Sequence, residues 1–418
     1  MLRLGLFALI GLAALILPPS PGASHALSGT LFSPLASPAP PGSGQPNLAV
    51  APDGTLWLSW IEPRGASARA LCAARLEGGR WSRPITIVAG DSLMAIGADI
   101  PALLMLKPRR LVALYPWRVP VPGHARDVRL IQSLDGGRTW GAPVVANRDH
   151  TPTEHGFACL VADSMGARAV WLDGRKSAVT DSTGHPSVLE EGLADMVVRS
   201  AVLTPDGALA DERELDGRAC DCCPTAAAST PAGALIVYRD RSPAEVRDIS
   251  ILRHAAGAWS GPRPVYEDGW KIEGCPVNGP AIAAAGDRVG VAWYTAAQDT
   301  HRVRVAFSDD GGIHFGVPVR IDQGAPNGRA ALVLLPDGGA LTAWLEDADS
   351  GSRLVARRIS AQGAVSAPVT VAGIPPGRGG GFPRMVRSGD RVLLAWTEPG
   401  KPGQVKTALA RLEPTPTH

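Results

Sequence analysis

The stretch LAVAPDGTLWLSWIE (residues 48–62) decides the fold, because its pattern returns six more times along the 418-residue chain. Each copy reads as a short apolar segment, a turn and an alternating strand, which is typical of a β-hairpin. Each alternating strand has an aromatic residue near its end, here called the closing aromatic. The seven closing aromatics are Trp60, Trp117, Trp171, Tyr238, Trp293, Trp344 and Trp396. Successive closing aromatics lie 57, 54, 67, 55, 51 and 52 residues apart, a spacing that indicates a repeat architecture.

A second hairpin follows most copies, as in IQSLDGGRTWGAPVV (residues 131–145). Two hairpins make a four-stranded blade, and blades repeated around an axis make a β-propeller. The seventh copy stops after its third strand, VKTALARLE (residues 405–413), so we expect LSGTLFSPL (residues 27–35) to add the outer strand and close the ring. The sequence therefore predicts one all-β domain over residues 27–418, a propeller of seven blades. Six blades with one irregular unit is the alternative, because the second and third copies are the weakest.

Residues 1–26 have the features of a signal peptide: a short basic start, an apolar run of fourteen residues (4–17) and the small residues Ser24 and Ala26. A membrane-spanning helix needs ~20 apolar residues, so no membrane insertion is expected after cleavage. Removing Arg3 from the 41 basic residues leaves 40 against 39 acidic residues, which excludes the charge pattern of a nucleic-acid-binding protein. We expect an exported, periplasmic or secreted monomer, in which disulfides are permitted.

Two short motifs carry a resemblance to a known family. SLDGGRTW (residues 133–140) matches the Asp-box pattern S-x-D-x-G-x-T-W, and SDDGGIHF (residues 308–315) matches it with His and Phe at its end. The chain thus resembles the Asp-box, or BNR-repeat, propellers of the sialidase-like superfamily. By position, between the third and fourth strands of a blade, both boxes are expected to be structural.

That resemblance implies a site in which three arginines hold a sugar carboxylate, a Tyr activated by a Glu is the nucleophile, and an Asp is the acid/base. The sequence departs from this pattern. The F-R-I-P motif that supplies the first arginine is absent, and none of the four tyrosines stands clearly beside a Glu.

One face of the predicted propeller, here called the channel mouth, collects the segments that enter each first strand and leave each second strand. Five second strands end in aromatic-x-acid (WIE, WLD, YRD, WLE and WTE). Since guanidinium binds carboxylate in a bidentate fork, the candidate substrate-binding residues are the arginines and one amide of this face: Arg175, Arg241, Arg329, Arg384 and Asn278. The candidate catalytic carboxylates are Asp173, Asp240 and Glu398. A polar insert (residues 176–195) is expected over the channel mouth as a flap.

An alternative interpretation of the acids at the channel mouth remains open. Acids at strand ends can cap neighbouring turns or pair with adjacent arginines, which would give a rigid and unreactive ring. Glycosidase chemistry needs two carboxylates ~5–10 Å apart, and Asp173 with Asp240 is one such candidate pair.

Four cysteines are predicted to meet at the channel mouth. CDCCPT (residues 220–225) precedes the first strand of the fourth blade, and EGCPVNGP (residues 273–280) holds the same place in the fifth. A disulfide to Cys275 would pin two blades together, whereas thiolates would bind Cu(I) or Zn(II). The candidate metal ligands are Cys220, Cys222, Cys223, Cys275 and His155. A catalytic thiol has the least support, and Cys72 and Cys159 read as small core residues.

Three functions follow from the sequence. The first is a glycan-directed hydrolase or acidic-sugar binder, to which the resemblance points. The second is a periplasmic copper- or zinc-binding protein that uses the cysteine cluster. The third is a binding scaffold with no small ligand and no catalytic activity.

Overall fold

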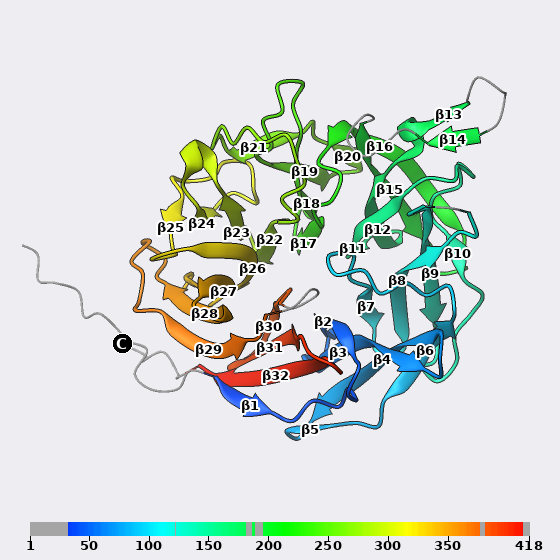
Figure 1. Ribbon diagram of the computed structural model, residues 1–418, viewed down its shortest axis with the longest axis horizontal. Helices are drawn as coiled ribbons and strands as arrows, with labels where there is room; N and C mark the ends of the chain where they lie inside the picture. The colour runs from blue at the N-terminus through cyan, green and yellow to red at the C-terminus, as the bar shows by residue number, and fades with distance from the viewer. Residues whose placement is uncertain (1–31, 122, 181–185, 189–194, 377–380, 413–418) are drawn as a thin grey trace, which may run out of the picture.

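The computed structural model describes residues 32–121, 123–180, 186–188, 195–376 and 381–412. Seven antiparallel sheets stand in a ring, each with its first strand nearest the centre (Figure 1). The prediction of a seven-bladed all-β propeller is confirmed, and the six-bladed alternative is wrong. The predicted signal peptide, residues 1–26, lies outside the described residues.

Blades 1 to 3 contain the strands from β2 to β16, apart from β13 and β14. Blade 1 consists of β2 (Gly44–Val50), β3 (Leu56–Arg64), β4 (Ala68–Glu77), β5 (Arg80–Trp81) and β6 (Ile85–Gly90). Blade 2 consists of β7 (Ala102–Lys107), β8 (Arg110–Arg118), β9 (Arg126–Ser133) and β10 (Val144–Val145). Blade 3 consists of β11 (His155–Asp163), β12 (Gly166–Asp173), β15 (Met196–Leu203) and β16 (Leu209–Ala219).

Blades 4 to 7 complete the circle. Blade 4 consists of β17 (Ala226–Thr230), β18 (Gly233–Arg239), β19 (Ile249–Ala255), β20 (Ala258–Trp259) and β21 (Arg263–Tyr266). Blade 5 consists of β22 (Ala281–Ala285), β23 (Arg288–Thr295), β24 (Arg302–Ser308) and β25 (Val319–Arg320). Blade 6 consists of β26 (Pro326–Leu334), β27 (Ala340–Ala348), β28 (Gly351–Ile359) and β29 (Val369–Ile374). Blade 7 consists of β30 (Arg384–Ser388), β31 (Arg391–Glu398), β32 (Gln404–Arg411) and β1 (Ser33–Leu35).

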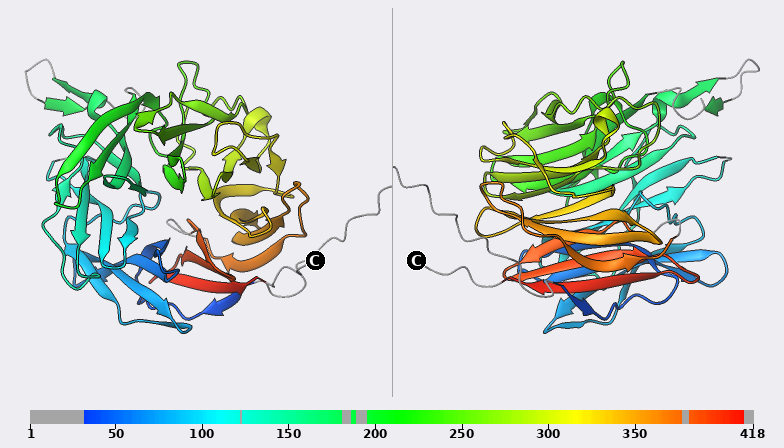
Figure 2. Two further views of the ribbon diagram at one scale, coloured as in Figure 1. Left: turned by 180° about the vertical axis from the view of Figure 1, so that it is seen from behind. Right: turned by 60° about the vertical axis from the view of Figure 1, so that its left-hand side comes forward.

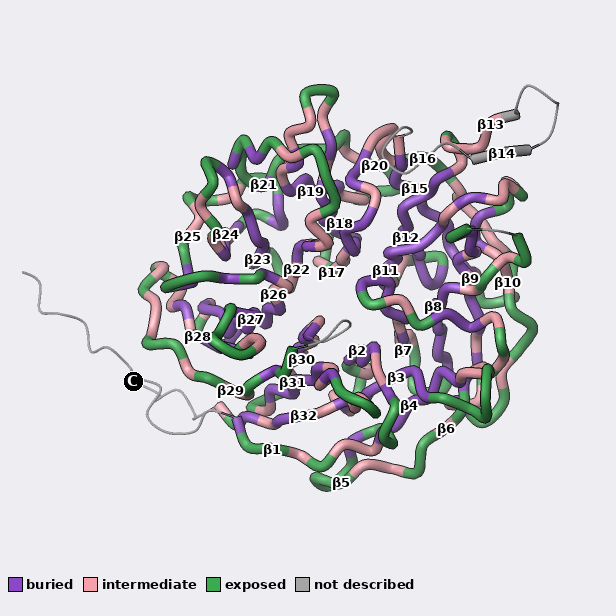
Figure 3. Tube along the Cα trace, viewed as in Figure 1, coloured by how far each residue is buried: buried purple, intermediate pink, exposed green. Residues whose placement is uncertain are grey.

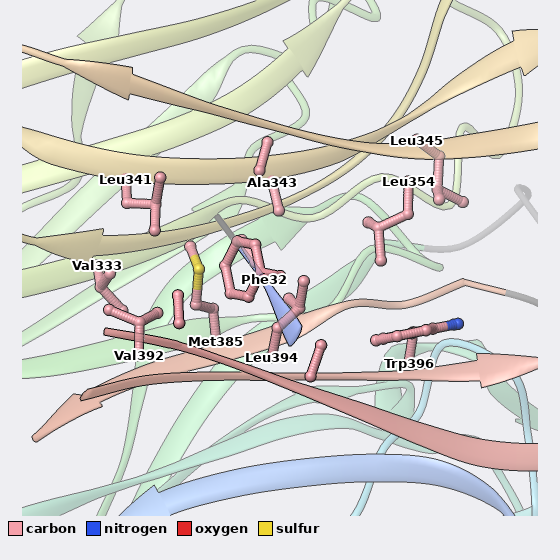
Figure 4. Packing of buried hydrophobic residues seen from close by; sticks show 14 of the residues in the cluster. Phe32, Val333, Leu341, Ala343, Leu345, Leu354, Met385, Val392, Leu394 and Trp396 are labelled. Atoms are coloured by element: carbon pink, nitrogen blue, oxygen red, sulfur yellow. The ribbon is translucent and has the colours of Figure 1, made fainter. Parts of the chain in front are cut away.

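The ring closes as the sequence predicts. Strand β1 pairs antiparallel with β32, with Ser33 opposite Leu409 and Leu35 opposite Thr407. Just before β1, the buried ring of Phe32 enters the cluster between blades 6 and 7, where Met385 and Leu394 lie beside it (Figure 4). The N-terminal strand thus supplies both the missing ladder and part of the core.

The core consists of apolar layers between neighbouring blades. Buried positions follow the strands, and exposed positions gather in the turns at the outside of the ring (Figure 3). Four of the closing tryptophans are among the largest fully buried side chains: Trp60, Trp171, Trp293 and Trp344. Tyr238 and Trp396 are also buried, so six of the seven closing aromatics are core residues between blades, and Trp117 is half-buried.

Both Asp boxes make the same turn between the third and fourth strands of a blade. In the first, Ser133 Oγ donates to Asp135 Oδ1 at 2.8 Å and accepts from the Gly137 amide at 2.8 Å. Asp135 Oδ1 also accepts two amides of the turn, at 2.9 and 3.0 Å. The second box repeats this pattern around Asp310. By topology both turns lie on the face opposite the channel mouth.

The described part of the polar insert does not cover the channel mouth. It comprises the 3-10 turn η1 (Arg175–Ser177), β13 (Ala178–Thr180) and β14 (Pro186–Val188). The β13–β14 ribbon projects outward from the ring beside blade 3 (Figures 1 and 2). The rest of the insert, apart from Asp195, lies outside the described residues.

Among the described residues, the structure contains no helix of the length and apolarity that a membrane span requires.

Candidate functional site

The acids that end the second strands mostly hold the core tryptophans. Residues two apart on a strand point to the same side, so the acid of an aromatic-x-acid triplet lies beside the indole. The indole Nε1 donates to that acid in three blades: Trp60 to Glu62 at 2.6 Å, Trp171 to Asp173 at 2.8 Å, and Trp344 to Glu346 at 3.1 Å. A buried indole N–H needs such an acceptor. These three acids therefore have a structural role. This agrees with the alternative interpretation of the channel mouth, in which its acids form a rigid and unreactive ring.

Asp173 belongs to a buried network between blades 2 and 3. Arg175 donates to its two carboxylate oxygens from Nε at 2.7 Å and from Nη2 at 2.8 Å. His155 Nε2 lies 3.6 Å from Asp173 Oδ1 and 3.2 Å from Asp149 Oδ1. His155 Nδ1 lies 3.0 Å from the Arg126 carbonyl oxygen, so the ring is held at both nitrogens.

This network brings acidic and basic side chains into contact, and the contact between His155 and Asp149 changes the pKa of both. Burial alone would lower the pKa of His155, but the hydrogen bond with Asp149 and the charges of Asp173 and Asp149 outweigh it and raise that pKa. Burial alone would raise the pKa of Asp149, but the hydrogen bonds with His155 and Thr151 and the charges of His155 and Arg175 together outweigh it and lower that pKa. Two carboxylates therefore face the imidazole of His155 and the guanidinium of Arg175. His155 was expected near the cysteines; the structure places it in this network instead.

Asp240 lies in a separate network, in blade 4. It accepts hydrogen bonds from Ser250 Oγ at 2.8 Å and from the Arg241 amide at 2.7 Å. Burial raises the pKa of Asp240, and the negative charge of Asp216 adds to that effect. Asp216 in turn accepts the hydroxyl of Tyr238, a tyrosine whose pKa burial raises far above its usual range. Tyr238 is therefore a neutral core group and does not have the properties of a nucleophile.

Glu398, at the end of β31 in blade 7, is the third candidate carboxylate. Its partner is Lys406, with 3.4 Å between Oε1 and Nζ, and both side chains are more than a third exposed. Asp173, Asp240 and Glu398 thus lie in three separate sets of contacts.

Three of the candidate ligand-binding residues are engaged within the protein. Arg241 pairs with Glu245 at 3.0 Å and with Asp221 at 3.3 Å. Arg175 is held by Asp173. Asn278 ties blades 5 and 6 together, because its Oδ1 accepts the Arg329 amide at 2.7 Å.

Arg329 and Arg384 belong to a group of side chains near the axis. The guanidinium of Arg329 stands 4.3 Å from the ring centre of Phe382, and Phe382 packs against the cluster between blades 3 and 4. Because Phe382 directly precedes β30 of blade 7, this segment reaches across the axis toward the opposite side of the ring. Figure 1 shows β30 nearer the centre than the rest of its blade.

Arg384 carries an uncompensated charge. Among the described residues no carboxylate lies within ion-pair distance of its guanidinium, and its buried Nε has no hydrogen-bond partner there. The neighbouring Cys159 has a pKa raised by burial to about 12, so this thiol is neutral and offers no counter-charge. Burial lowers the pKa of Arg384 to about 10, and the group remains a cation at neutral pH.

Strained backbone at the channel mouth is a feature that the sequence analysis missed. A residue with positive φ stands just before or at the start of the first strand in five blades: Gln45 at 53°, Phe157 at 53°, Val277 at 50°, Arg329 at 56° and Gly381 at 67°. Left-handed backbone is costly for residues other than Gly, above all for β-branched Val277, and such strain gathers at functional sites. No residue type at these positions signals it, except Gly381.

The structure brings the four predicted cysteines together. The Sγ atoms of Cys220, Cys222 and Cys223 lie within 4.8 Å of one another, and all three residues are buried. The Cys220 and Cys223 sulfurs are 3.3 Å apart. Cys275 is exposed and contacts Cys222. The six cysteines all fall within described ranges, and no disulfide joins any two of them there.

Positive charge surrounds this cysteine cluster. Arg247, which is only 3% exposed, places Nη1 3.4 Å from Cys220 Sγ. Hydrogen bonds from the Cys222 and Cys223 thiols, helped by the charge of Arg239, hold the pKa of Cys220 well below its usual range.

The ring of seven blades and its two Asp boxes have the fold that the resemblance implies. The sialidase-like propeller fold is confirmed. No family model matches the chain, and no curated protein sequence matches it.

Solved structures that match the chain are propellers of low sequence identity. The polysaccharide lyase Uly1 is 10% identical over 88% of this chain and 90% of that one, with a TM-score of 0.51. A puromycin-hydrolyzing peptidase of Mycobacterium tuberculosis is 13% identical over 93% of this chain and 57% of its own, with a TM-score of 0.50. The Hadza microbial sialidase Hz136 is 12% identical over 86% and 76%, with a TM-score of 0.46. At these identities the likeness shows the fold alone, although glycan-active enzymes are among the matches.

Proposed function

We propose that the protein is exported and binds an acidic sugar near the channel mouth, with Arg384 as the group that receives the ligand's carboxylate. The observation that carries this proposal is the unpaired guanidinium of Arg384. A charge surrounded by protein is costly unless an opposite charge meets it, and a bound carboxylate would supply both that charge and an acceptor for Nε. The glycan-active propellers among the matching structures make sugar acids the first ligand class to test.

Arg329 and Phe382 give the proposed site its second feature. An aromatic ring next to a guanidinium offers an apolar face and an edge of donors, a combination that suits the two sides of a sugar ring. Burial lowers the pKa of Arg329, so a bound anion would stabilise its charged form as well.

We propose binding without hydrolysis. A glycosidase requires two carboxylates that flank one glycosidic bond. Asp173 is engaged by Trp171 and Arg175, and Glu398 pairs with Lys406, so neither is poised for proton transfer. Asp240 has the raised pKa of a general acid, yet its carboxylate already accepts two hydrogen bonds from within blade 4.

Calorimetric titration with sialic, glucuronic and galacturonic acids, and with neutral sugars for comparison, tests the binding. We expect an acidic sugar to bind, and Arg384→Met to weaken that binding about tenfold to a hundredfold, the worth of a hydrogen bond to a charged group. Arg411→Met is the matched control, because Arg411 is 74% exposed and pairs only loosely with Asp390 at 3.5 Å. Equal affinities of the two variants would refute the assignment.

The same sugars as fluorogenic glycosides test the second half of the proposal. We expect no turnover by the mature protein. Turnover that Asp240→Asn abolishes would make the protein a hydrolase and Asp240 its acid. Failure of every sugar to bind would leave the scaffold function that the sequence also allowed.

A further inference from the structure

The sulfurs of Cys220, Cys222 and Cys223 are spaced like the ligands of one metal ion. A disulfide bond is ~2.05 Å long, so the 3.3 Å between the Cys220 and Cys223 sulfurs is no bond. Thiolates that lie ~2.3 Å from a common metal ion are about 3.8–4.0 Å from one another, by simple trigonometry. All three sulfurs fall within 4.8 Å of one another, so small side-chain rotations bring them to that spacing.

The backbone fixes this arrangement at both ends of the loop. The Cys220 amide donates to the last carbonyl of β18 at 3.0 Å. At the other end, the amide and the hydroxyl of Thr225 both donate to the Phe157 carbonyl in blade 3, each at 2.9 Å. The six-residue loop is therefore tied to blades 3 and 4, and its cysteines cannot spread apart freely.

The loop that carries Cys275 is pressed against this cluster. A Cβ on Gly279 would lie 2.2 Å from the Pro224 carbonyl oxygen, so only Gly allows so close an approach. Of the three buried cysteines, Cys222 is the most exposed, and it is the one that Cys275 contacts. Cys275 itself is exposed to solvent. The Cys275 sulfur thus lies between the three buried cysteines and the solvent.

The surroundings favour anionic sulfur. Metal binding converts thiols to thiolates and gathers negative charge, which needs nearby cations. Arg247 contacts Cys220, as described above, and Arg239 is buried with hydrogen bonds to three neutral backbone carbonyls. Asp221 and Glu245 offset part of this charge: Asp221 pairs with Arg241 at 3.3 Å, and Glu245 pairs with Arg247 at 3.0 Å.

We propose that Cys220, Cys222 and Cys223 bind one Cu(I) ion as three thiolates, and that Cys275 is the exposed thiol through which the ion enters and leaves. Soft thiolates select Cu(I) or Zn(II), and Cu(I) accepts three sulfur ligands, whereas structural Zn(II) is almost always four-coordinate. Each Cu–S bond replaces an S–H bond whose proton goes to water, and no electrons are transferred. During exchange, the Cys275 sulfur bonds to the ion as the Cys222 sulfur releases it.

The binding experiment uses the mature protein, reduced and held under nitrogen. Cu(I) is titrated as its acetonitrile complex against bathocuproine disulfonate, and Zn(II) is titrated in parallel. We expect one Cu(I) per chain, bound far more tightly than Zn(II), and a loss of Cu(I) affinity of at least ~100-fold in Cys222→Ser. Cys72→Ser is the matched control, because Cys72 is a buried thiol within β4.

The variant Cys275→Ser separates the three-sulfur site from a four-sulfur one. We expect it to keep one Cu(I) per chain and to release that ion to bathocuproine severalfold more slowly than the wild type. A loss of metal as complete as in Cys222→Ser would overturn the assignment of three ligands. X-ray absorption of the wild-type Cu(I) protein gives the same answer without any variant, as three sulfur neighbours or another number.

Two further outcomes would overturn the proposal as a whole. One is a disulfide among these four cysteines in the exported protein together with no Cu(I) uptake after reduction. The other is undiminished Cu(I) binding in Cys222→Ser. Neither outcome touches the sugar titration, which depends on Arg384, so the two proposals fail independently.

Discussion

The substitution Asp173→Asn distinguishes a catalytic carboxylate from a structural one. Asp173 is fully buried, accepts the Trp171 indole at 2.8 Å and holds Arg175 through two hydrogen bonds. Asn keeps the size of the side chain but removes its charge and turns an amide NH2 toward one of the donors. A structural carboxylate predicts a loss of stability, whereas a purely catalytic one predicts a loss of turnover in a protein of normal stability.

The size of the stability loss follows from the contacts. Removing one partner of a buried ion pair costs ~3–5 kcal/mol, and Asn recovers part of the indole bond, so we expect about 3 kcal/mol. Unfolding entropy is ~2.1 cal/mol/K per residue, which for the roughly 380 residues from 32 to 412 comes to about 0.8 kcal/mol/K. The expected fall in Tm is therefore about 4 °C.

Differential scanning calorimetry measures this shift, and Glu398→Gln is the matched control. Glu398 ends the second strand of blade 7 as Asp173 ends that of blade 3, but its pair with Lys406 is more than a third exposed. An exposed pair contributes ~1 kcal/mol or less, so we expect the control to shift Tm by about 1 °C at most. Equal shifts in the two variants would refute the structural role of Asp173.

Three other predictions test the ring and its loops. Gly279→Ala should separate the two cysteine loops and lower Cu(I) affinity in the bathocuproine competition, whereas Gly261→Ala, which points into open space, should leave it unchanged. Phe32→Ala should lower Tm by about 4–6 °C in calorimetry, since truncating a buried Phe costs ~3–5 kcal/mol, and a smaller effect would mean that closure depends on the β1 ladder alone. His155 has a raised pKa, so its stabilising contribution is complete below its ordinary pKa of ~6.5 and is lost as pH rises through the higher folded value. Calorimetry between about pH 6 and pH 9 should show that His155→Gln removes this pH-dependent part of the stability; an unchanged slope would contradict the imidazolium.

The fold was predictable because its signal is repeated. Seven copies of one hairpin pattern, a missing last strand and an N-terminal segment of the right pattern leave little freedom in how the ring closes. Even the weak second and third copies form regular blades, since Trp117 and Trp171 still stand at the positions that face a neighbouring blade. The structural role of the strand-end acids could also have been derived, because the aromatic-x-acid spacing places the acid beside the indole N–H.

The site was predictable only in part. Topology alone places Cys275 beside Cys222, because both precede the first strand of adjacent blades. His155 also stands at the start of a first strand, but two of its partners come from residues before it: Asp149 lies six residues upstream, and the Arg126 carbonyl lies in blade 2. A local contact of this kind depends on the path of a single loop, which no repeat pattern specifies.

The two kinds of segment at the channel mouth have different tasks in this propeller. Where the second strands leave, acids such as Glu62 and Asp173 stabilise buried indoles and hold the ring together. Where the first strands begin, residues with left-handed backbone bend the chain, as at Phe157 and Val277. Strain of ~1–3 kcal/mol at such residues persists only where surrounding contacts enforce it. Both proposed sites lie among these bent segments, so the chemistry of the protein is to be sought at the beginnings of its inner strands rather than in the ring of acids.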